Sequence, residues 1–249
     1  MTVHRLAVIL ARAGSKGLPH KNVLPVAGRP MIAHTINHAK AAREIDAICL
    51  TTDDPRAAEI GRAEGLFVVN RPAELATDTA TVDAAARHAV DLYEKAVCPV
   101  THVALLYANV PVRPEGVIDR AMRHLIDTGA DSVRSLAPVT KQHPDWIHRL
   151  DGDRMVQFRR NSIYRRQELE PLYYHDGAVV AVTRRALFAT DPDDNHAFMG
   201  ADRRGVVVEE GMAVDVDSTA DLQIAEAVIR NREQRRLDGP LTPAGLEEQ

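Results

Sequence analysis

Cysteine is scarce in this sequence of 249 residues, with only Cys49 and Cys98, so we expect neither a disulfide framework nor a zinc site. Aromatic residues make up 4% of the chain, which argues against the stacking surfaces that bind single-stranded nucleic acids. No apolar run approaches the roughly 18 residues of a membrane span, and the first strand-like run begins at Leu6, so we expect no signal peptide. The net charge is only −4, so no overall field draws the chain to nucleic acid or anionic lipid. These absences favour a cytoplasmic protein that binds neither.

The order of apolar segments favours one α/β domain. Apolar residues make up 45% of the chain, enough for a sizeable core. Strands are predicted over 6–11, 46–52, 66–69, 103–107, 131–136, 177–183 and 206–208. Helices are predicted over 30–42, 56–64, 81–95, 114–128, 184–188 and 219–232. This alternation predicts a three-layer α/β/α sandwich with a mostly parallel sheet over residues 1–233, followed by a flexible tail, 234–249.

The first predicted strand, Leu6–Ala11, runs directly into a basic loop with two glycines, Gly14 and Gly17. Glycine permits backbone conformations and close approaches that a Cβ would forbid. The loop carries four residues with cationic groups: Arg12, Lys16, His20 and Lys21. The loop matches neither the Walker A pattern nor the dinucleotide fingerprint. Even so, glycines and cations at a strand end are typical of phosphate binding, so we expect a polyphosphate site here. The alternative is a solvated surface turn.

Asp215 and Asp217 form the clearest acidic pair in the chain. Residues two apart in an extended segment point to the same side, so both carboxylates can face one point. Two such oxygen ligands suit a Mg²⁺ ion that also binds substrate phosphates. The alternative is that Asp217 or Ser218 caps the last predicted helix.

Three segments together resemble the acylneuraminate cytidylyltransferases, also called CMP-sialic acid synthetases. Residues 11–32 follow the signature A-R-x-G-S-K-G-[LI]-P-x-K-N and P-x-x-G-[RK]-P-[ML]-I almost without gaps. Residues 71–78 resemble R-P-x-x-L-A-x-D, and residues 215–218 resemble D-[IV]-D-[ST]. The resemblance implies a fold like that of the nucleotide-diphospho-sugar transferases. It also implies that CTP and a 2-keto-3-deoxy sugar acid (sialic acid or a related nonulosonate) give a CMP-sugar and pyrophosphate.

The resemblance also implies roles for individual residues. Those that would offset phosphate and leaving-group charge are Arg12, Lys16 and Lys21. The implied ligands of a Mg²⁺ cofactor are Asp215 and Asp217. The implied nucleotide-binding residues are Ala11, Ala13, Gly14, Ser15, Asn22, Arg71 and Thr81. The implied acceptor-binding residues are Tyr107, Asn109, Arg165, Arg166 and Gln167.

Two further pairs of residues have a simpler structural interpretation. Asp53 and Asp54 follow a predicted strand, and we expect a helix-capping turn there rather than a catalytic role. Asp78 and Thr79 match the family pattern near the nucleotide, but they are equally consistent with the entry to the next helix.

Residues from about 138 to 175 are polar and irregular, and we expect them to form an insertion. In the family the corresponding segment is implied to cross to a second subunit, where an arginine helps to bind the substrate. The resemblance therefore implies a homodimer in which Arg165 or Arg166 serves that role. The alternative is an ordinary solvated charge run.

One departure from the family pattern concerns the acceptor. Tyr107 stands where the family usually has a glutamine, and a phenol cannot reproduce the paired donor and acceptor of an amide. The sequence therefore supports the nucleotide half of the reaction better than the identity of the sugar. Two alternatives stay open: a nucleotidyltransferase for another sugar acid or sugar phosphate, and a catalytically silent nucleotide-binding homologue.

Overall fold

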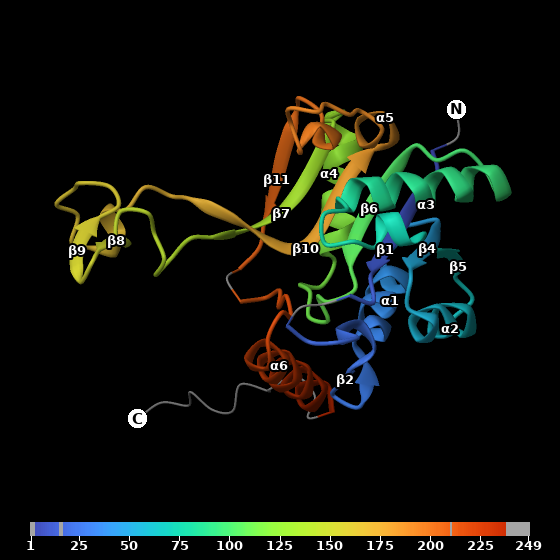
Figure 1. Cartoon of the computed structure of the whole chain (residues 1–249), viewed down its shortest axis with the longest axis horizontal. Coiled ribbons are helices and arrows are strands. Elements are labelled where there is room, and N and C mark those ends of the chain that lie inside the picture. The colour runs from blue at the N-terminus through green and yellow to red at the C-terminus, as the bar shows by residue number, and fades with distance from the viewer. Residues whose placement is uncertain (1–2, 15–16, 210, 238–249) are drawn as a thin grey trace, which may run out of the picture.

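A seven-stranded sheet in the order β11-β7-β10-β6-β1-β4-β5 forms the centre of the computed structural model, which describes residues 3–14, 17–209 and 211–237 (Figure 1). Its strands are β1 (Arg5–Ala11), β4 (Ala47–Thr52), β5 (Phe67–Asn70), β6 (His102–Tyr107), β7 (Ser132–Pro138), β10 (Tyr173–Thr183) and β11 (Arg203–Val207). Only β10 runs antiparallel to its neighbours in this sheet. The prediction of a mostly parallel sheet is confirmed.

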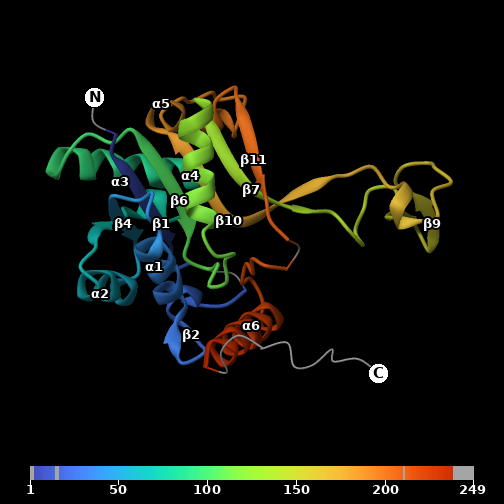
Figure 2. The same ribbon diagram turned by 180° about the vertical axis from the view of Figure 1, so that it is seen from behind.

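The sheet is covered on both faces, which explains why its central strands are continuously apolar. One face packs against α1 (Met31–Ala41), α2 (Pro55–Ala63) and α4 (Val117–Thr128), through side chains such as Ile36 and Met122. The other packs against α3 (Val82–Ala96) and α5 (Arg184–Leu187), through side chains such as Val90 and Leu187. Leu6 to Ala11 of β1 are buried between these layers. The predicted three-layer sandwich is therefore confirmed (Figures 1 and 2).

A third apolar cluster joins the last helix to the start of the chain. Helix α6 (Thr219–Leu237) packs Ala225 and Ile229 against Val26 of the small hairpin formed by β2 (Pro25–Val26) and β3 (Arg29–Pro30). Val216, just before α6, is buried in the same cluster. This packing brings the residues before α6 to the segment that follows β1.

Between β7 and β10 the chain leaves the sandwich as a long arm (Figures 1 and 2). The predicted insertion is therefore present, but it is not wholly irregular. Strands β8 (His148–Asp151) and β9 (Arg154–Gln157) pair as an antiparallel hairpin around Gly152, whose φ of 63° requires the left-handed conformation. Buried His143 supports the arm, because its Nε2 lies 3.0 Å from the Glu170 carbonyl.

Several predicted boundaries differ from the structure. Helix α6 continues to Leu237, so residues 234–237 of the predicted tail are helical, and residues 238–249 lie outside the described residues. Helix α4 begins at Val117 rather than at 114, because Gly116 in the left-handed conformation stands at its start. Both cysteines are free, as expected.

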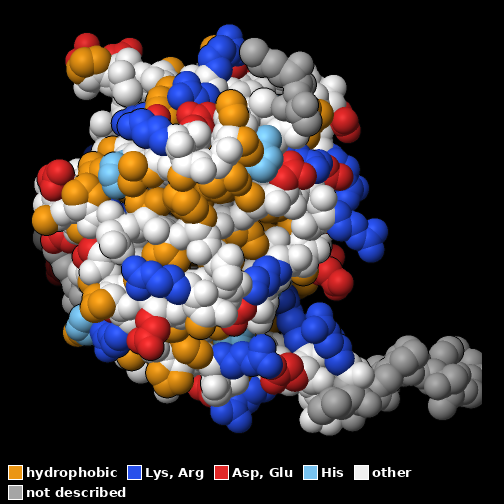
Figure 3. Space-filling model, turned by 90° about the vertical axis from the view of Figure 1, so that its right-hand side faces the viewer, with side chains coloured by type: hydrophobic (Ala, Val, Ile, Leu, Met, Phe, Trp, Pro, Cys, Tyr) orange, Lys and Arg blue, Asp and Glu red, His pale blue; other side chains and the backbone are white. Residues whose placement is uncertain are grey.

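The edge of the sheet at β5 is partly open to solvent. A shallow groove there is lined by Phe67, Val69 and Leu92, and Figure 3 shows apolar side chains gathered across the middle of this side of the molecule. Within the described residues, no helix has both the length and the apolar character needed to cross a bilayer.

Candidate functional site

The basic loop after β1 is held by its neighbours in the sheet. The Ala13 amide donates to Asp53 Oδ1 over 2.8 Å, and the Asn22 side-chain amide donates to the Arg12 carbonyl over 2.9 Å. Asp53 thus supports the loop rather than the chemistry, while Asp54 caps α2 by accepting from the Arg56 amide, as predicted. The loop is therefore shaped before any ligand binds.

The loop lies directly against the acidic segment 215–217. A Cβ on Gly17 would stand only 2.5 Å from the Asp217 carbonyl oxygen, so only glycine fits there. Lys21 Nζ lies 2.5 Å from Asp217 Oδ1 and donates to the Val216 carbonyl over 3.0 Å. The two motifs that the sequence predicts to act together are adjacent in the fold.

A third segment, the loop after β6, completes this arrangement. The Val216 amide donates to the Asn109 carbonyl over 2.8 Å, and the Val214 amide donates to the Val112 carbonyl over 3.2 Å. The Asn109 side-chain amide donates to Asp215 Oδ1. Asn109 therefore orients the first carboxylate of the pair, while Lys21 pairs with the second.

The helix-cap alternative for the acidic pair can now be decided. Ser218 precedes α6, and its Oγ accepts from the Asp221 amide, while Asp221 Oδ2 accepts from the Ser218 amide over 2.8 Å. This reciprocal pair is a capping box, and Ser218 supplies the cap. The Asp217 carboxylate is not used as the cap and lies instead beside Lys21.

The electrostatics of the pair fit a cation. Desolvation by the surrounding protein and the charge of Asp217 raise the pKa of Asp215 to about 6, although Asp215 is still accessible to solvent. Lys21 and Arg113 act in the opposite direction but do not cancel this effect. No group of three or more acidic, histidine or cysteine ligands occurs in the described part of the chain, so the protein offers a metal two carboxylates at most here. Such a pair leaves positions for phosphate oxygens and water, as Mg²⁺ sites require.

Arg113 braces the loop that carries Asn109, a role that sequence reasoning missed. Its fully buried guanidinium donates to the carbonyls of Tyr107, Val110 and Ala178 and to the Thr35 hydroxyl. Burial lowers the pKa of Arg113 to about 9. Nothing in the sequence indicates that this side chain is buried.

The predicted nucleotide residues lie near the carboxyl ends of the parallel strands, as the basic loop does. Arg12 forms an ion pair with Asp78 at 3.0 Å and donates to the Thr77 carbonyl, so it links the basic loop to the segment before α3. The Arg71 guanidinium is directed to Thr51, and burial lowers its pKa. Thr81 caps α3, so the cap expected at Asp78 or Thr79 lies two or three positions later.

The remaining nucleotide positions differ in what the structure says of them. Ala11 is fully buried at the end of β1, and a Cβ on Gly14 would meet nothing within 4 Å. Asn22 is almost fully buried, and its Oδ1 has no hydrogen-bond partner among the described residues. Ser15 and Lys16 lie outside the described residues.

Tyr107, the departure from the family pattern, interacts with Arg134, a residue that lines a basic pocket. Burial raises the pKa of its phenol, the charge of Arg134 opposes this, and the charge of Asp215 adds to it. Arg134 lies 3.2 Å from His175 Nε2, and both line a pocket of about 290 Å³ with His196, Arg203 and Arg204. Arg134 has no sequence motif around it, and only its place on β7 reveals it.

Arg165, Arg166 and Gln167 are not brought to this site within one chain. All three are exposed on the arm, in or next to the short 3₁₀ turn Arg166–Glu168, and the arm projects away from the sandwich (Figure 1). Their prediction as substrate-binding residues therefore requires a second copy of the chain.

Comparisons with known proteins agree with this geometry. Residues 6–197 match the sequence profile of a family described as cytidylyltransferase. An N-acylneuraminate cytidylyltransferase from Streptococcus agalactiae serotype III is 37% identical over 178 residues, 70% of this chain but only 42% of that protein. A CMP-N,N'-diacetyllegionaminic acid synthase from Legionella pneumophila is 29% identical over 90% of this chain and 95% of that protein. The chain thus spans less than half of the streptococcal relative.

Among solved structures, CMP:2-keto-3-deoxy-manno-octonic acid synthetase complexed with CTP superposes with a TM-score of 0.69, over 92% of this chain and 99% of that one. Its sequence is 19% identical, so the likeness shows the fold alone. It confirms the predicted nucleotide-diphospho-sugar transferase-like fold.

Proposed function

The chain belongs to the cytidylyltransferase family, and on that premise we propose that it transfers CMP from CTP to a 2-keto-3-deoxy sugar acid and releases pyrophosphate. The observation that supports this most is the contact between the basic loop and the acidic segment, where Gly17 meets the Asp217 backbone and Lys21 meets its carboxylate. The site thus places cations and carboxylates together at a strand end, where a nucleoside triphosphate needs cations for its phosphates and carboxylates for its metal ion.

In the proposed reaction the anomeric hydroxyl of the sugar acid attacks the α-phosphorus, and the bond to the pyrophosphate leaving group breaks. The chain contributes mainly position and charge. Lys21 and Arg12 would offset the negative charge on the phosphates, with Lys16 as a third cation that lies outside the described residues. A Mg²⁺ ion held by Asp215 and Asp217 would neutralise charge on the α-phosphate when bound.

For the acceptor we propose that Tyr107 and Arg134 bind the sugar carboxylate. Arg134 is the cation that acts on the Tyr107 phenol, and its partner His175 lies with it in the basic pocket. A guanidinium and a phenol both donate hydrogen bonds, which suits a carboxylate. Arg134→Ala should raise the KM for the sugar acid about tenfold or more and leave the KM for CTP unchanged. Exposed Arg120 on α4 provides the matched control, Arg120→Ala.

We also propose that two copies of the chain form a homodimer in the cytoplasm, and that the arm of each reaches the site of the other. Exposed apolar side chains on the arm, including Leu150, Met155 and Tyr164, support an interface there. Arg165, Arg166 and Gln167 would then approach the acceptor from the partner subunit.

Pyrophosphate release tests the proposal. CTP, UTP, GTP and ATP are crossed against N-acetylneuraminate, ketodeoxynonulosonate, legionaminate, pseudaminate and ketodeoxyoctonate, with Mg²⁺ and with EDTA as control. Release with CTP and one sugar acid, abolished by EDTA, is the expected result. Release only with another nucleotide, or with a sugar phosphate, would favour the broader nucleotidyltransferase reading that Tyr107 leaves open. CTP binding without release from any acceptor would show a silent homologue.

A further inference from the structure

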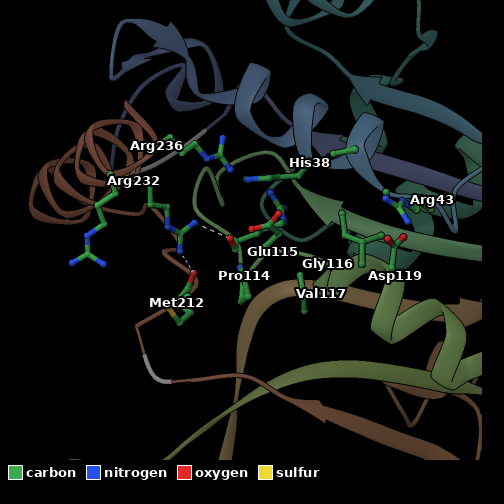
Figure 4. Close-up of a pocket in the computed structure, with 15 residues that line it drawn as sticks. His38, Arg43, Pro114, Glu115, Gly116, Val117, Asp119, Met212, Arg232 and Arg236 are labelled. Carbon is green, nitrogen blue, oxygen red and sulfur yellow. Dashed lines mark hydrogen bonds between the residues drawn. The ribbon is translucent and has the colours of Figure 1, made fainter. Parts of the chain in front are cut away.

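A cavity of about 550 Å³ lies between the C-terminal part of α1, the start of α4 and α6. Figure 4 shows its lining, with Arg43 on one side, Arg232 and Arg236 on the other, and His38 and Glu115 between them. Apart from buried Arg113, no residue that lines this cavity belongs to the candidate site described above. The cavity is therefore a separate feature of the fold.

The lining has an excess of positive charge. Five arginines line the cavity, namely Arg43, Arg113, Arg232, Arg235 and Arg236. Only two acidic residues face them, Glu115 and Asp119. Asp119 is already engaged, because its Oδ1 accepts from the Glu44 amide over 2.9 Å. Within the described part of the chain, Arg43, Arg235 and Arg236 form no ion pair, so much of this charge is not compensated by protein.

Neighbouring groups respond to that charge. His38 has its pKa lowered to about 3, first by burial and then by the charges of Arg113, His34, Arg232 and Arg236. Burial and the charge of Arg236 also lower the pKa of Arg232, while Glu115 opposes them. The cavity thus has a positive potential that an anion would relieve.

The lining also includes a buried histidine and a helix N-terminus. His38 Nδ1 is buried and has no hydrogen-bond partner among the described residues. Helix α4 begins in the lining at Gly116, which offers no side chain to cap its first turn, although the Val117 amide donates to the Pro114 carbonyl over 3.4 Å. The positive end of this helix adds to the charge of the arginines and favours an anion.

Apolar side chains make up another part of the wall: Ala41, Ala42, Pro114, Val117, Ile118 and Met212. A cavity of this size accommodates a small organic molecule rather than a bare ion. We propose that it is a second ligand site, which binds an organic anion with a phosphate or carboxylate group on an apolar body. The arginines bind the anionic group, and the apolar wall contacts the body.

Isothermal titration calorimetry on the full chain tests this site with three probes that share one ring: phenyl phosphate, phenylacetate and uncharged benzyl alcohol. We expect at least one of the anions to bind at one site per chain with a Kd below about 1 mM, and benzyl alcohol not to bind in that range. The stronger of the two anions identifies whether phosphate or carboxylate is the preferred group.

Matched variants locate the binding. Arg236→Ala and, across the cavity, Arg43→Ala should each weaken binding about tenfold. Arg230→Ala, on the same helix but paired with Glu226 outside the cavity, should change it less than about twofold. Lys21→Ala should leave it unchanged, because Lys21 belongs to the nucleotide site.

Four results would overturn the proposal. These are no binding of either anion, equal binding of benzyl alcohol, unchanged binding in both Arg236→Ala and Arg43→Ala, and an equal loss in Arg230→Ala. A loss in Lys21→Ala alone would place the anion in the nucleotide site instead. Pyrophosphate release by the wild type bears on the proposed function separately.

Discussion

The nucleotide edge, which is the site where the basic loop after β1 meets residues 215–217, differs from the arm in how much of its function one chain contains. At the edge, Lys21 and Asp217 are 196 positions apart in sequence but form an ion pair at 2.5 Å. Asn109, from a third segment, binds Asp215 in the same place. On the arm, Arg165 and Arg166 are exposed, and the segment projects away from the sandwich (Figure 1).

A single chain positions the residues of the nucleotide edge, but it does not position the cationic residues of the arm against a site. The edge has its hydrogen bonds made within the chain, so its geometry exists before a ligand or partner arrives. The arm is ordered largely by its own contacts, such as the Trp146 Nε1 donation to the Ile163 carbonyl. The cationic side chains of the arm can serve their proposed function only when the arm contacts a partner subunit.

The largest expected effect comes from removing a carboxylate of the acidic pair at the nucleotide edge. Asp217→Ala removes the partner of Lys21 and one of the two proposed metal ligands, so kcat should fall about 1,000-fold. Pyrophosphate release at saturating CTP, sugar acid and Mg²⁺ measures it. The control is Glu226→Ala on α6, which removes a half-buried carboxylate paired with Arg230 and should retain kcat. An unchanged kcat in Asp217→Ala would contradict the metal assignment.

The next prediction concerns Arg113, which holds the loop that carries Asn109. Arg113→Met removes the buried guanidinium that donates to the carbonyls of Tyr107, Val110 and Ala178, so we expect the free energy of unfolding to fall by about 3–5 kcal/mol. Urea denaturation followed by circular dichroism measures this. Arg120→Met, on the exposed side of α4, should change it by less than about 0.5 kcal/mol. Equal midpoints for the two variants would show that the brace contributes little.

These two residues also show what sequence can and cannot predict. Asp217 belongs to a short motif that the family resemblance joins with the basic loop in one site, so its neighbourhood was predictable. Arg113 is an arginine among apolar residues. Its burial depends on the carbonyls of Tyr107 and Ala178, and Ala178 is 65 positions away from it in sequence. No local pattern indicates such long-range partners.

The same reasoning applies to the arm and the last helix. The hairpin at β8 and β9 was missed because exposed strands lack a buried face and so show no apolar alternation, although the turn residues Gly152 and Asp153 are a known hairpin signal. The end of α6 was placed too early because a charged segment such as residues 233–236 is compatible with both a frayed tail and an exposed helix. Whether the arm completes a partner's site concerns a second chain, which neither a single sequence nor a single chain contains.

A complementation experiment sharpens the comparison for the arm. The double variant Arg165→Ala/Arg166→Ala should raise the KM for the sugar acid about tenfold, since the proposed partner contact is lost. Co-expression with Asp217→Ala should restore up to about a quarter of the wild-type sites, because half of the dimers are mixed and each mixed dimer has one intact site. Purification through two different tags isolates the mixed dimer. No recovery in the mixed dimer would contradict a site shared between subunits.

The smallest expected effect separates stability from function at the edge itself. Asp215 has its pKa raised to about 6, above its ordinary value of 3.8, so the folded state holds the proton more tightly than the unfolded state. The ionised carboxylate therefore destabilises the fold, fully above pH 6 and progressively less as the pH falls toward 4. Asp215→Asn should raise Tm by about 2 °C at pH 8, a value reduced by solvent screening, and leave it unchanged near pH 4.

Differential scanning calorimetry at both pH values measures this, with Asp153→Asn in the exposed turn of the arm as control. The control should shift Tm equally at the two pH values, because its carboxylate lies outside the edge. Asp215→Asn should meanwhile lose most of its turnover, so that the same substitution stabilises the fold and removes the activity. A stabilisation that persists at pH 4 would show that the effect comes from packing and not from the charge of Asp215, and the edge would then differ from the arm in geometry alone.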